Sequence, residues 1–588
     1  MSSNVLSKRW VFRHIDATHE AWPEVLALQK QLGIRPLWCQ LLIRRGIKTY
    51  DAAYRFFRPA LSHLHDPFLM PDMHKVCQRI CQAIEQQQTI FIFGDYDVDG
   101  TTSVAILCDF LRQCGAKCCF DIPDRLTEGY GLSTAAVDRA LSANASLLIT
   151  LDCGMKDISP IAYAKAAGMD VIVCDHHLPG TVWPDAYGIL NPLLQRSDGQ
   201  VYPYSELSAC GITFKLIQAL HAYMKSEVNI LAYLDRVALS IAADIVPLTG
   251  ENRTLLSLGL QRINAHPSTG VQALIEVSGL AGHEQTLGMR ELGFMLAPRI
   301  NAAGRIKDAH TAVELFMEKD LPKARELAAE LHQRNQQRIE NDRNIAQEAR
   351  EWIESHPEEK RRKTIVVYQP HWHKGVIGIV ASRLVEWYFK PTVVLTAAEE
   401  PEWTAVNKLA GSARSVPGFN LYQAVDACGH LLERYGGHDY AAGLVLAEEN
   451  FIAFKETFES VVASTIREEQ LMPTIYIDAV IQPEDITPSF IQLLKQFEPF
   501  GMDNEPPVFL MQKVTNLANI QPLKHDHLKF SITRNTLPPL EVVGFQMGAY
   551  FDLLRLQKPV DICFTIEENY WNGRSAVQLK LQDMRISS

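Results

Sequence analysis

Three acidic motifs each follow a short apolar run in the first half of the chain. GDYD (94–97) follows TIFIF, LDCG (151–154) follows LLIT, and DHH (175–177) follows VIVC. Amphipathic segments separate the apolar runs, so strands and helices alternate from about residue 74 to 260. Strands separated by helices at this spacing form βαβ units, which predicts an α/β fold with a mainly parallel sheet. The expected strands are 89–93, 117–122, 147–151 and 171–174, and the expected helices are 76–84, one from 101, 134–142 and 160–167.

The second half of the chain has two further patterns. From about residue 322 to 355, the stretch KARELAAELHQRNQQRIENDRNIAQEAREWIES contains neither Gly nor Pro, which predicts one connecting helix roughly 50 Å long at about 1.5 Å per residue. A second α/β unit follows, with strands at 363–368, 392–395 and 443–446. After Pro473 short strands predict a small barrel or sandwich; they are 475–480, 528–533, 540–545, 560–566 and 576–581.

These patterns divide the chain into five parts. We expect an N-terminal helical segment, a first α/β domain, a connecting helix, a second α/β domain and an all-β domain. The corresponding ranges are 1–70, 71–320, 321–358, 359–468 and 469–588.

Composition limits the class of protein. Apolar residues make up 47 % and charged residues 21 % of the 588 residues, which is typical of a soluble globular protein. No apolar run approaches the roughly 18 residues of a membrane span, so we expect no membrane contact and a cytoplasmic location. The net charge of −11 argues against a protein that coats nucleic acid nonspecifically. It still permits an enzyme that binds nucleic acid in one channel, because acids clustered at a metal site count toward the total.

The acidic motifs are expected to meet in space. The carboxyl ends of parallel strands face one crevice, so Asp95, Asp97, Asp152 and the DHH motif should converge there. Asp244, in the apolar segment SIAADIVPL, is a further candidate. A solvated turn is the plain alternative for GDYDVDG. An EF-hand loop is disfavoured because the twelfth position counted from Asp95 is Ile106, where that loop needs a Glu.

Crowded carboxylates repel one another unless a divalent metal neutralises them. Asp95, Asp97, Asp152, His176 and Asp244 offer the ligands for two divalent ions. Two ions about 3.5–4 Å apart can share a carboxylate, activate a water and stabilise a displacement at phosphorus. An imidazole ligand favours manganese, with magnesium as the alternative, because magnesium prefers oxygen ligands.

The combination of motifs resembles a known family. GDYDVDG, LDCG, DHH and AADIVPL, in this order, are similar to the DHH phosphoesterase superfamily. The motifs PRINAAGR (298–305), GSARS (411–415) and GGH (436–438) narrow the resemblance to the RecJ family of single-strand-specific exonucleases, over residues 70 to 585. The resemblance implies a catalytic DHH domain, a DHH-associated second domain across a cleft, and a C-terminal OB-fold.

The resemblance also assigns roles to the residues of the motifs. It makes Asp95, Asp97, Asp152, His176 and Asp244 the metal ligands. It implies that His177 touches the substrate phosphate or donates to the leaving group, and that Asp175 orients the imidazoles. Asp99 is interpreted as a turn or helix-start residue. Position 91 is Phe, where the pyrophosphatase branch of the superfamily has His, so pyrophosphate is a disfavoured substrate.

Further residues are expected to bind DNA. In the second domain, Ser412, Arg414, Ser415 and His438 can grip phosphate through hydroxyl, guanidinium and close backbone approach. Arg299, Asn301 and Arg305 resemble positions that line the nucleic-acid path. Arg125 lies just past a strand near the crevice.

The implied activity is digestion of single-stranded DNA from the 5′ end to 5′-mononucleotides, in DNA repair and recombination. We expect a monomer, and the resemblance allows contacts with a single-strand-binding protein and a helicase, which no motif marks. Two other functions are weighed: a DHH phosphatase for short oligonucleotides or cyclic dinucleotides, and a non-catalytic replication factor with the same fold. The phosphatase should lack an OB-like tail, and the replication factor should have lost metal ligands.

Overall fold

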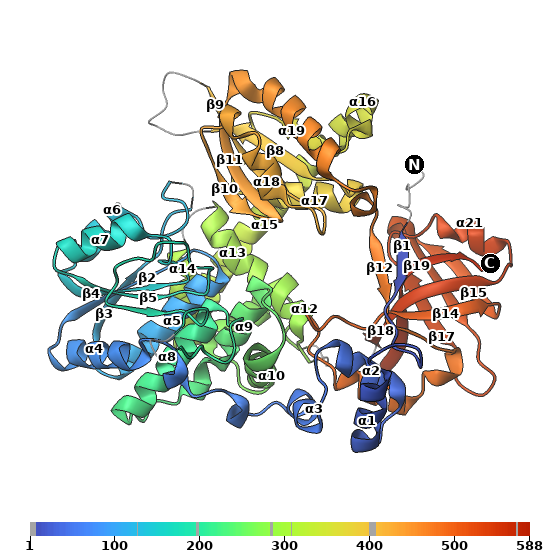
Figure 1. Ribbon diagram of the computed structural model, residues 1–588, viewed down its shortest axis with the longest axis horizontal. Helices are drawn as coiled ribbons and strands as arrows, with labels where there is room; N and C mark the ends of the chain where they lie inside the picture. Colours follow the sequence, from blue (N-terminus) through green and yellow to red (C-terminus); the bar gives the residue numbers. More distant parts are fainter. Residues whose placement is uncertain are drawn as a thin grey trace.

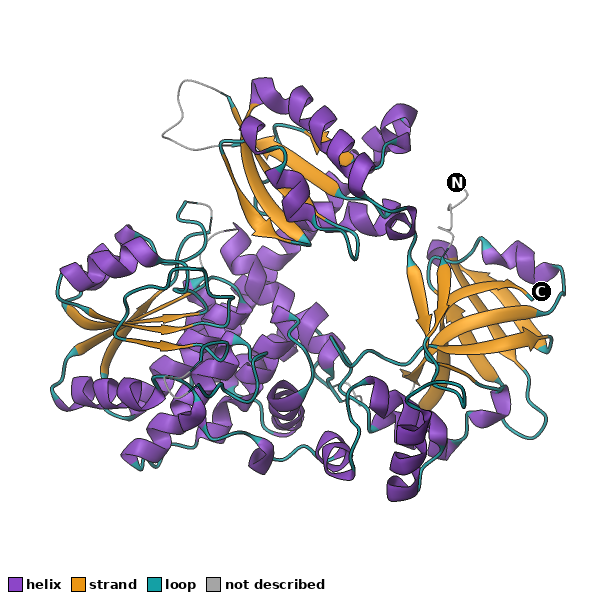
Figure 2. Cartoon of the chain, in the orientation of Figure 1, coloured by secondary structure: helices purple, strands orange, loops and turns teal. Residues whose placement is uncertain are grey.

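The computed structural model describes residues 8–125, 127–195, 199–282, 286–306, 309–398, 407–571 and 574–587. Figure 2 shows the strands in three separate groups. Helices pack around the groups that belong to the two α/β domains. Figure 1 shows the first α/β domain at the left, the second α/β domain at the top and the C-terminal sheet at the right. Within the described ranges, no helix has both the length and the apolar character needed to cross a bilayer.

The first sheet carries the three acidic motifs. Its five strands are all parallel, in the order β3-β2-β4-β5-β6, as the βαβ pattern predicts. The strands are β2 (Thr89–Gly94), β3 (Lys117–Asp121), β4 (Ala145–Leu151), β5 (Asp170–Cys174) and β6 (Gly188–Leu190). The helices are α4 (Met73–Glu85), α5 (Val98–Gln113), α6 (Thr134–Ser142), α7 (Ile158–Ala166), α8 (Ala209–Met224), α9 (Leu234–Asp244), α10 (Gly250–Ala265), α11 (Thr269–Val277), α12 (Met289–Glu291), α13 (Ala297–Ile306) and α14 (His310–Met317).

One long helix joins the two α/β domains. The polar stretch forms α15 (Leu321–Ser355), a single helix of 35 residues. Ala328 and Leu331 in its first half pack into the core of the first domain. Ile345 and Ile353 in its second half pack into a core with β7 and α17. The helix is therefore held at both ends, and its buried stripe explains why so polar a sequence stays helical.

The second domain contains two strands that the sequence pattern did not indicate. Its sheet has the order β10-β11-β9-β8-β7. GSARS lies on β9 and GGH on β10, where small residues hide the apolar alternation of a strand. The elements are α16 (Pro357–Arg361), β7 (Ile365–Tyr368), α17 (Ile377–Tyr388), β8 (Thr392–Ala397), β9 (Lys408–Arg414), α18 (Leu421–Asp426), β10 (Arg434–His438), β11 (Ala441–Ala447) and α19 (Phe451–Thr465).

The C-terminal domain is built on one seven-stranded sheet, in the order β13-β14-β18-β19-β17-β16-β15. The sequence pattern indicated the all-β character but missed β14 and β15. The elements are β12 (Thr474–Ile477), β13 (Ala479–Val480), α20 (Pro488–Lys495), β14 (Phe509–Val514), β15 (Leu517–Leu523), β16 (His527–Ile532), β17 (Leu540–Gly544), α21 (Tyr550–Arg555), β18 (Val560–Trp571) and β19 (Arg574–Ile586).

The N-terminal segment shares a core with the C-terminal domain. Its strand β1 (Arg9–Phe12) pairs in parallel with β12, beside the C-terminal sheet in Figure 1. Its helices are α1 (Trp22–Leu32), α2 (Pro36–Arg44) and α3 (Tyr50–Phe57). The rings of Trp38 and Phe490 lie 4.7 Å apart, and those of Phe56 and Phe497 lie 5.6 Å apart. The segment thus contains helices and also the short strand β1, which the sequence pattern did not indicate, because pairing between residues this far apart in sequence leaves no local pattern.

Candidate metal and nucleic-acid site

The GDYDVDG loop turns tightly from β2 into α5. Asp97 caps α5, and its carboxylate accepts hydrogen bonds from the backbone N–H groups of Asp99 (2.8 Å) and Gly100 (3.1 Å). A Cβ at Gly100 would clash with the backbone of Asp95. The glycine therefore lets the helix start directly beneath Asp95, and the negative charge at the end of the strand faces the crevice.

The structure brings the five predicted metal ligands together. One carboxylate oxygen each of Asp95, Asp97 and Asp152 lie within 4.8 Å of one another. His176 Nε2 lies 3.3 Å from Asp152 Oδ1 and 3.8 Å from Asp244 Oδ2. We call Asp95, Asp97, Asp152, His176 and Asp244 the acid cluster.

The electrostatics of the acid cluster fit a divalent cation. Burial raises the pKa of Asp95, and the nearby charge of Asp97 raises it further. Burial and neighbouring carboxylates likewise raise the pKa of Asp152 and Asp244. Asp95 Oδ1 is buried and accepts no hydrogen bond from the described residues. A buried carboxylate oxygen without a donor, among acids that repel one another, is the ligand arrangement that a metal ion stabilises.

Asp152 is held in a strained backbone conformation. Its φ is 63°, in the left-handed region that non-glycine residues rarely adopt. The hydroxyl of Tyr130 donates to the Asp152 carbonyl oxygen at 2.8 Å. Strain of this kind costs of order 1–3 kcal/mol and is found at functional sites.

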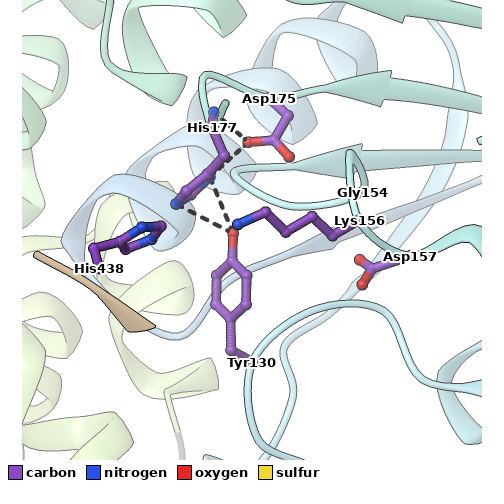
Figure 3. A pocket seen from close by; sticks show the side chains of 7 residues that line it. All are labelled: Tyr130, Gly154, Lys156, Asp157, Asp175, His177 and His438. Carbon is purple, nitrogen blue, oxygen red and sulfur yellow. Dashed lines mark hydrogen bonds and ion pairs between the residues drawn. The ribbon is translucent and has the colours of Figure 1, made fainter. Parts of the chain in front are cut away.

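A pocket of 280 Å³ lies beside the acid cluster. In Figure 3, His177 lies between Asp175 and Tyr130, and Asp175 Oδ1 is 2.7 Å from His177 Nδ1. Burial lowers the pKa of His177, but the hydrogen bond and the charge of Asp175 outweigh it and leave the pKa raised. His438 reaches this pocket from β10 of the second domain, and Lys156 lines it from the first.

The two histidines of the DHH motif have different partners. Asp175 contacts His177, whereas His176 faces Asp152 and Asp244. Asp175 also accepts a hydrogen bond from the Met155 N–H at 3.0 Å. The family resemblance implied that Asp175 orients both imidazoles. In the structure its carboxylate contacts the imidazole of His177.

Asp99 has a larger role than a turn residue. It lies in the first turn of α5, as expected, but its carboxylate is buried. It accepts hydrogen bonds of 2.7 Å from the N–H groups of Ala209 and Cys210 and from the Ser240 hydroxyl. Asp99 thus ties the acidic loop to α8 and α9, and α9 ends at Asp244.

A groove of 710 Å³ runs between the two α/β domains. We call it the basic groove, because among the described residues that line it none is acidic and five are cationic: Arg125, Arg305, Lys374, Arg414 and Arg434. Burial and the nearby charge of Arg125 lower the pKa of Arg305 to about 9. Arg414 Nη1 donates to Ser412 Oγ at 3.0 Å, and both residues line the groove. Such a concentration of positive charge suits phosphate.

Three further predicted DNA contacts form hydrogen bonds within the protein. Asn301 Oδ1 accepts from the Val98 N–H at 3.1 Å. Arg299 donates to the Met295 carbonyl and to His332 Nδ1. The Ser415 hydroxyl donates to the Phe419 carbonyl at 3.0 Å.

The lining residues that the sequence prediction did not name include Tyr130, Lys156, Lys374 and Arg434. Lys156 stands two positions after LDCG, and Lys374 and Arg434 stand beside or near glycines. A basic residue next to a glycine motif is the signal that could have found Lys156, Lys374 and Arg434.

Known proteins share this organisation. Sequence profiles match at residues 89–241 (DHH family, N-terminal domain), 362–464 (DHHA1 domain) and 477–583 (RecJ OB domain). The single-stranded-DNA-specific exonuclease RecJ of Bacillus subtilis (strain 168) is 37 % identical over 96 % of this chain and 70 % of that protein. RecJ of Escherichia coli (strain K12) is 32 % identical over 93 % of this chain and 96 % of that protein.

The fold agrees with a solved relative. The crystal structure of RecJ from Thermus thermophilus in complex with Mn²⁺ has a TM-score of 0.81 at 28 % identity, covering 99 % of this chain and 80 % of that one. The Mg²⁺ complex of the same protein has a TM-score of 0.75 at 27 % identity and covers 79 % of that chain.

Two features argue against the two other functions weighed above, a phosphatase for short substrates and a non-catalytic replication factor. The chain has the OB domain that a phosphatase for short substrates should lack. It also keeps the five candidate ligands that a non-catalytic factor should have lost. The chain belongs to the RecJ family of single-stranded-DNA-specific exonucleases, which hydrolyse phosphodiester bonds.

Proposed function

We propose that this enzyme digests single-stranded DNA from the 5′ end, releases 5′-mononucleotides and serves DNA repair and recombination. The observation that carries the direction is the basic groove beside the acid cluster. A terminal phosphate carries about −1.5 to −2 charge, more than an internal phosphodiester, and five cations without an acid match it. A 3′ end with a free hydroxyl offers no such charge.

The acid cluster is proposed to hold two divalent ions, preferably manganese, with magnesium as the alternative. Support comes from Asp95 Oδ1, which accepts no hydrogen bond from the described residues, and from the raised pKa values of the buried acids. The imidazole of His176 among them favours a transition metal over magnesium. When bound, such ions activate a water and stabilise charge on the oxygens of the displacement at phosphorus.

The chain's own residues position the substrate. Asp175 and Tyr130 hold the imidazole of His177 beside the cluster, where it can contact the scissile phosphate or donate to the leaving oxygen. Arg414 and Ser412 of the second domain are proposed to bind the terminal phosphate, and they line the basic groove together with Arg125 and Arg305 of the first. His438 and Lys156 border the same space.

Arg299, Asn301 and Ser415 remain predicted DNA contacts. The hydrogen bond that Asn301 Oδ1 accepts from the Val98 N–H of the acidic loop supports a positioning role for Asn301. Action as a monomer, association with a single-strand-binding protein or a helicase, and a cytoplasmic location rest on the family resemblance. Light scattering and pull-down with purified proteins test the oligomeric state and the partners.

One assay tests the polarity, strand preference and metal dependence together. Oligonucleotides carrying a label at either end, single-stranded or paired, are incubated with manganese, magnesium or a chelator. We expect mononucleotides from the 5′ end of single strands, fastest with manganese and none with chelator. Digestion from the 3′ end, or equal digestion of blunt duplexes, would overturn the proposal.

A further inference from the structure

Tyr96 lies between two predicted metal ligands and contacts a cation of the basic groove. It separates Asp95 from Asp97 in the acidic loop. The Cζ atom of Arg125 lies 4.7 Å from the centroid of the Tyr96 ring, within the ~6 Å at which an aromatic face attracts a cation. Arg125 in turn lines the basic groove. One aromatic ring therefore connects the acidic loop to the groove.

The ring of Tyr96 is the partner that holds the guanidinium of Arg125. In the part of the chain that the structure describes, this guanidinium forms neither an ion pair nor a hydrogen bond. Its neighbours differ, because Arg414 donates to Ser412 and Arg305 donates to the Gly375 carbonyl. An aromatic face attracts a cation without occupying its N–H groups. The donors of Arg125 therefore stay available for a phosphate.

Arg125 needs such a partner because other cations surround it. Burial lowers the pKa of Arg305 and of Arg414, and the charge of Arg125 lowers both further. The three guanidinium groups are thus close enough to repel one another. Repulsion drives Arg125 away from the groove as long as no anion is bound there, and the attraction of the Tyr96 ring opposes that movement.

The acidic loop fixes the position of Tyr96. A Cβ at Gly304 would lie 3.1 Å from both the Cβ atom and the carbonyl oxygen of Tyr96, so α13 packs closely against the loop. The next residue, Asp97, caps α5, and the half-buried ring packs against the core of the first domain. The loop that presents Asp95 and Asp97 to the acid cluster therefore also fixes the ring beneath Arg125.

We infer that Tyr96 is a positioning residue that holds Arg125 in the basic groove and thereby sets the preference for a terminal 5′ phosphate. The inference rests on the proposed function. Without the aromatic face, Arg125 keeps its charge but loses its fixed place. A terminal phosphate then loses one contact, whereas the phosphodiesters along the strand keep theirs.

Binding without turnover tests the role of Tyr96. Full-length protein in chelator is titrated with a 20-nucleotide oligothymidylate that carries a 3′ fluorophore and either a 5′ phosphate or a 5′ hydroxyl. We expect Tyr96→Leu to weaken binding of the phosphorylated strand about fivefold, and that of the other strand less than about twofold. The preference is also measured as the ratio of kcat/KM for the two strands with manganese.

Two further variants serve as references. Tyr96→Phe should keep the wild-type preference, because it keeps the aromatic face. The matched control is Tyr187→Leu, which removes a half-buried ring of the first domain from beneath Lys75, also at 4.7 Å, and does not line the groove. Tyr187→Leu should leave the preference unchanged.

A double-mutant cycle separates positioning from stability. If Tyr96 acts through Arg125, adding Tyr96→Leu to Arg125→Ala should change the affinity for the phosphorylated strand by less than about twofold. Manganese affinity, measured by calorimetry, should also stay within about twofold, since Asp95 and Asp97 remain. A residue that only supports the fold would weaken binding of both strands equally, with or without Arg125.

The outcomes distinguish the two proposals. If wild type digests from the 5′ end and prefers the phosphorylated strand, but Tyr96→Leu keeps the full preference, the inference fails alone. Equal weakening of both strands by Tyr96→Leu would overturn it as well. A wild type without any preference for the 5′ phosphate also overturns the inference, whereas digestion from the 3′ end overturns the proposed function itself.

Discussion

The side-chain oxygen of Asn301 accepts a hydrogen bond from the backbone N–H of Val98 at 3.1 Å. This bond joins PRINAAGR to GDYDVDG across two hundred residues of sequence. Gly304 of the same motif packs against Tyr96, so the acidic loop is held from two points. The carbonyl of Arg305 in turn lies against Gly375, and Gly378 lies against Arg414 and Ser412. The motifs therefore form a chain of contacts from the acid cluster to the basic groove.

Asn301→Ala should reduce turnover more than tenfold with a modest loss of stability. Removing one hydrogen bond costs about 0.5–1.5 kcal/mol, but the freed loop carries Asp95 and Asp97. Manganese titration by calorimetry should show weaker binding. Asn264→Ala, which removes hydrogen bonds to Leu260 and Leu287 away from the cluster, is the control. Wild-type turnover of Asn301→Ala would show that the bond does not position the loop.

Gly100→Ala should disable the metal site and destabilise the protein. The added methyl group would meet the Asp95 backbone, and overpacking of this kind costs about 1–3 kcal/mol or more. Thermal melting and manganese affinity should both fall. Gly180→Ala serves as the control because its Cβ would meet only ordinary contacts. An active, stable Gly100→Ala protein would contradict the tight loop.

Asp152→Asn and His176→Ala should lower turnover below about a tenth of wild type, because a lost ligand costs several kcal/mol of transition-state stabilisation. In chelator, Asp152→Asn should melt about 2–4 °C above wild type, since one repelling charge is gone. Adding manganese should raise the melting temperature of wild type more than that of either variant. A larger rise in a variant would remove that residue from the metal site.

Arg253→Ala should loosen the C-terminal domain from the first domain. This buried guanidinium stacks 3.7 Å from the Phe56 ring and donates to five backbone carbonyls, those of Phe56, Gln496, Phe497, Glu498 and Pro499. Losing the donor leaves buried acceptors unsatisfied, at about 1–3 kcal/mol each. We expect a lower-melting second transition, and a greater loss of activity on long strands than on short ones. Arg325→Ala, which removes an exposed ion pair with Glu276, should change neither property.

Arg414→Ala should impair cleavage of 5′-phosphorylated strands far more than cleavage of strands with a 5′ hydroxyl. Its guanidinium lines the basic groove and is proposed to bind the terminal phosphate. Metal affinity should stay unchanged. Arg362→Ala, which removes ion pairs with Glu359 and Glu456 and does not line the basic groove, is the control. Equal loss on both substrates would reduce Arg414 to general backbone binding.

The amino-acid sequence by itself determined the parallel sheet, the long helix and the meeting of the acidic motifs. These features follow from short-range periodicity and from the geometry of parallel strands, both of which are local. The same reasoning placed Asp95, Asp97, Asp152 and His176 at one crevice. Asp244 was added as an acid in an apolar segment, and the structure brings all five residues together.

Only the tertiary structure decided which distant segments support the site. Trp38 packs on Phe490, Asn301 holds Val98, and Asp99 caps α8. Strand β9 lies between β8 and β11, and the edge strand β10 pairs with β11, although their glycines and alanines have little strand preference. Phe294 looks like a core residue in sequence, yet the π-helical turn Leu292–Leu296 exposes it. Contacts between residues far apart in sequence depend on how completed elements pack, and that packing leaves no periodic trace in the chain.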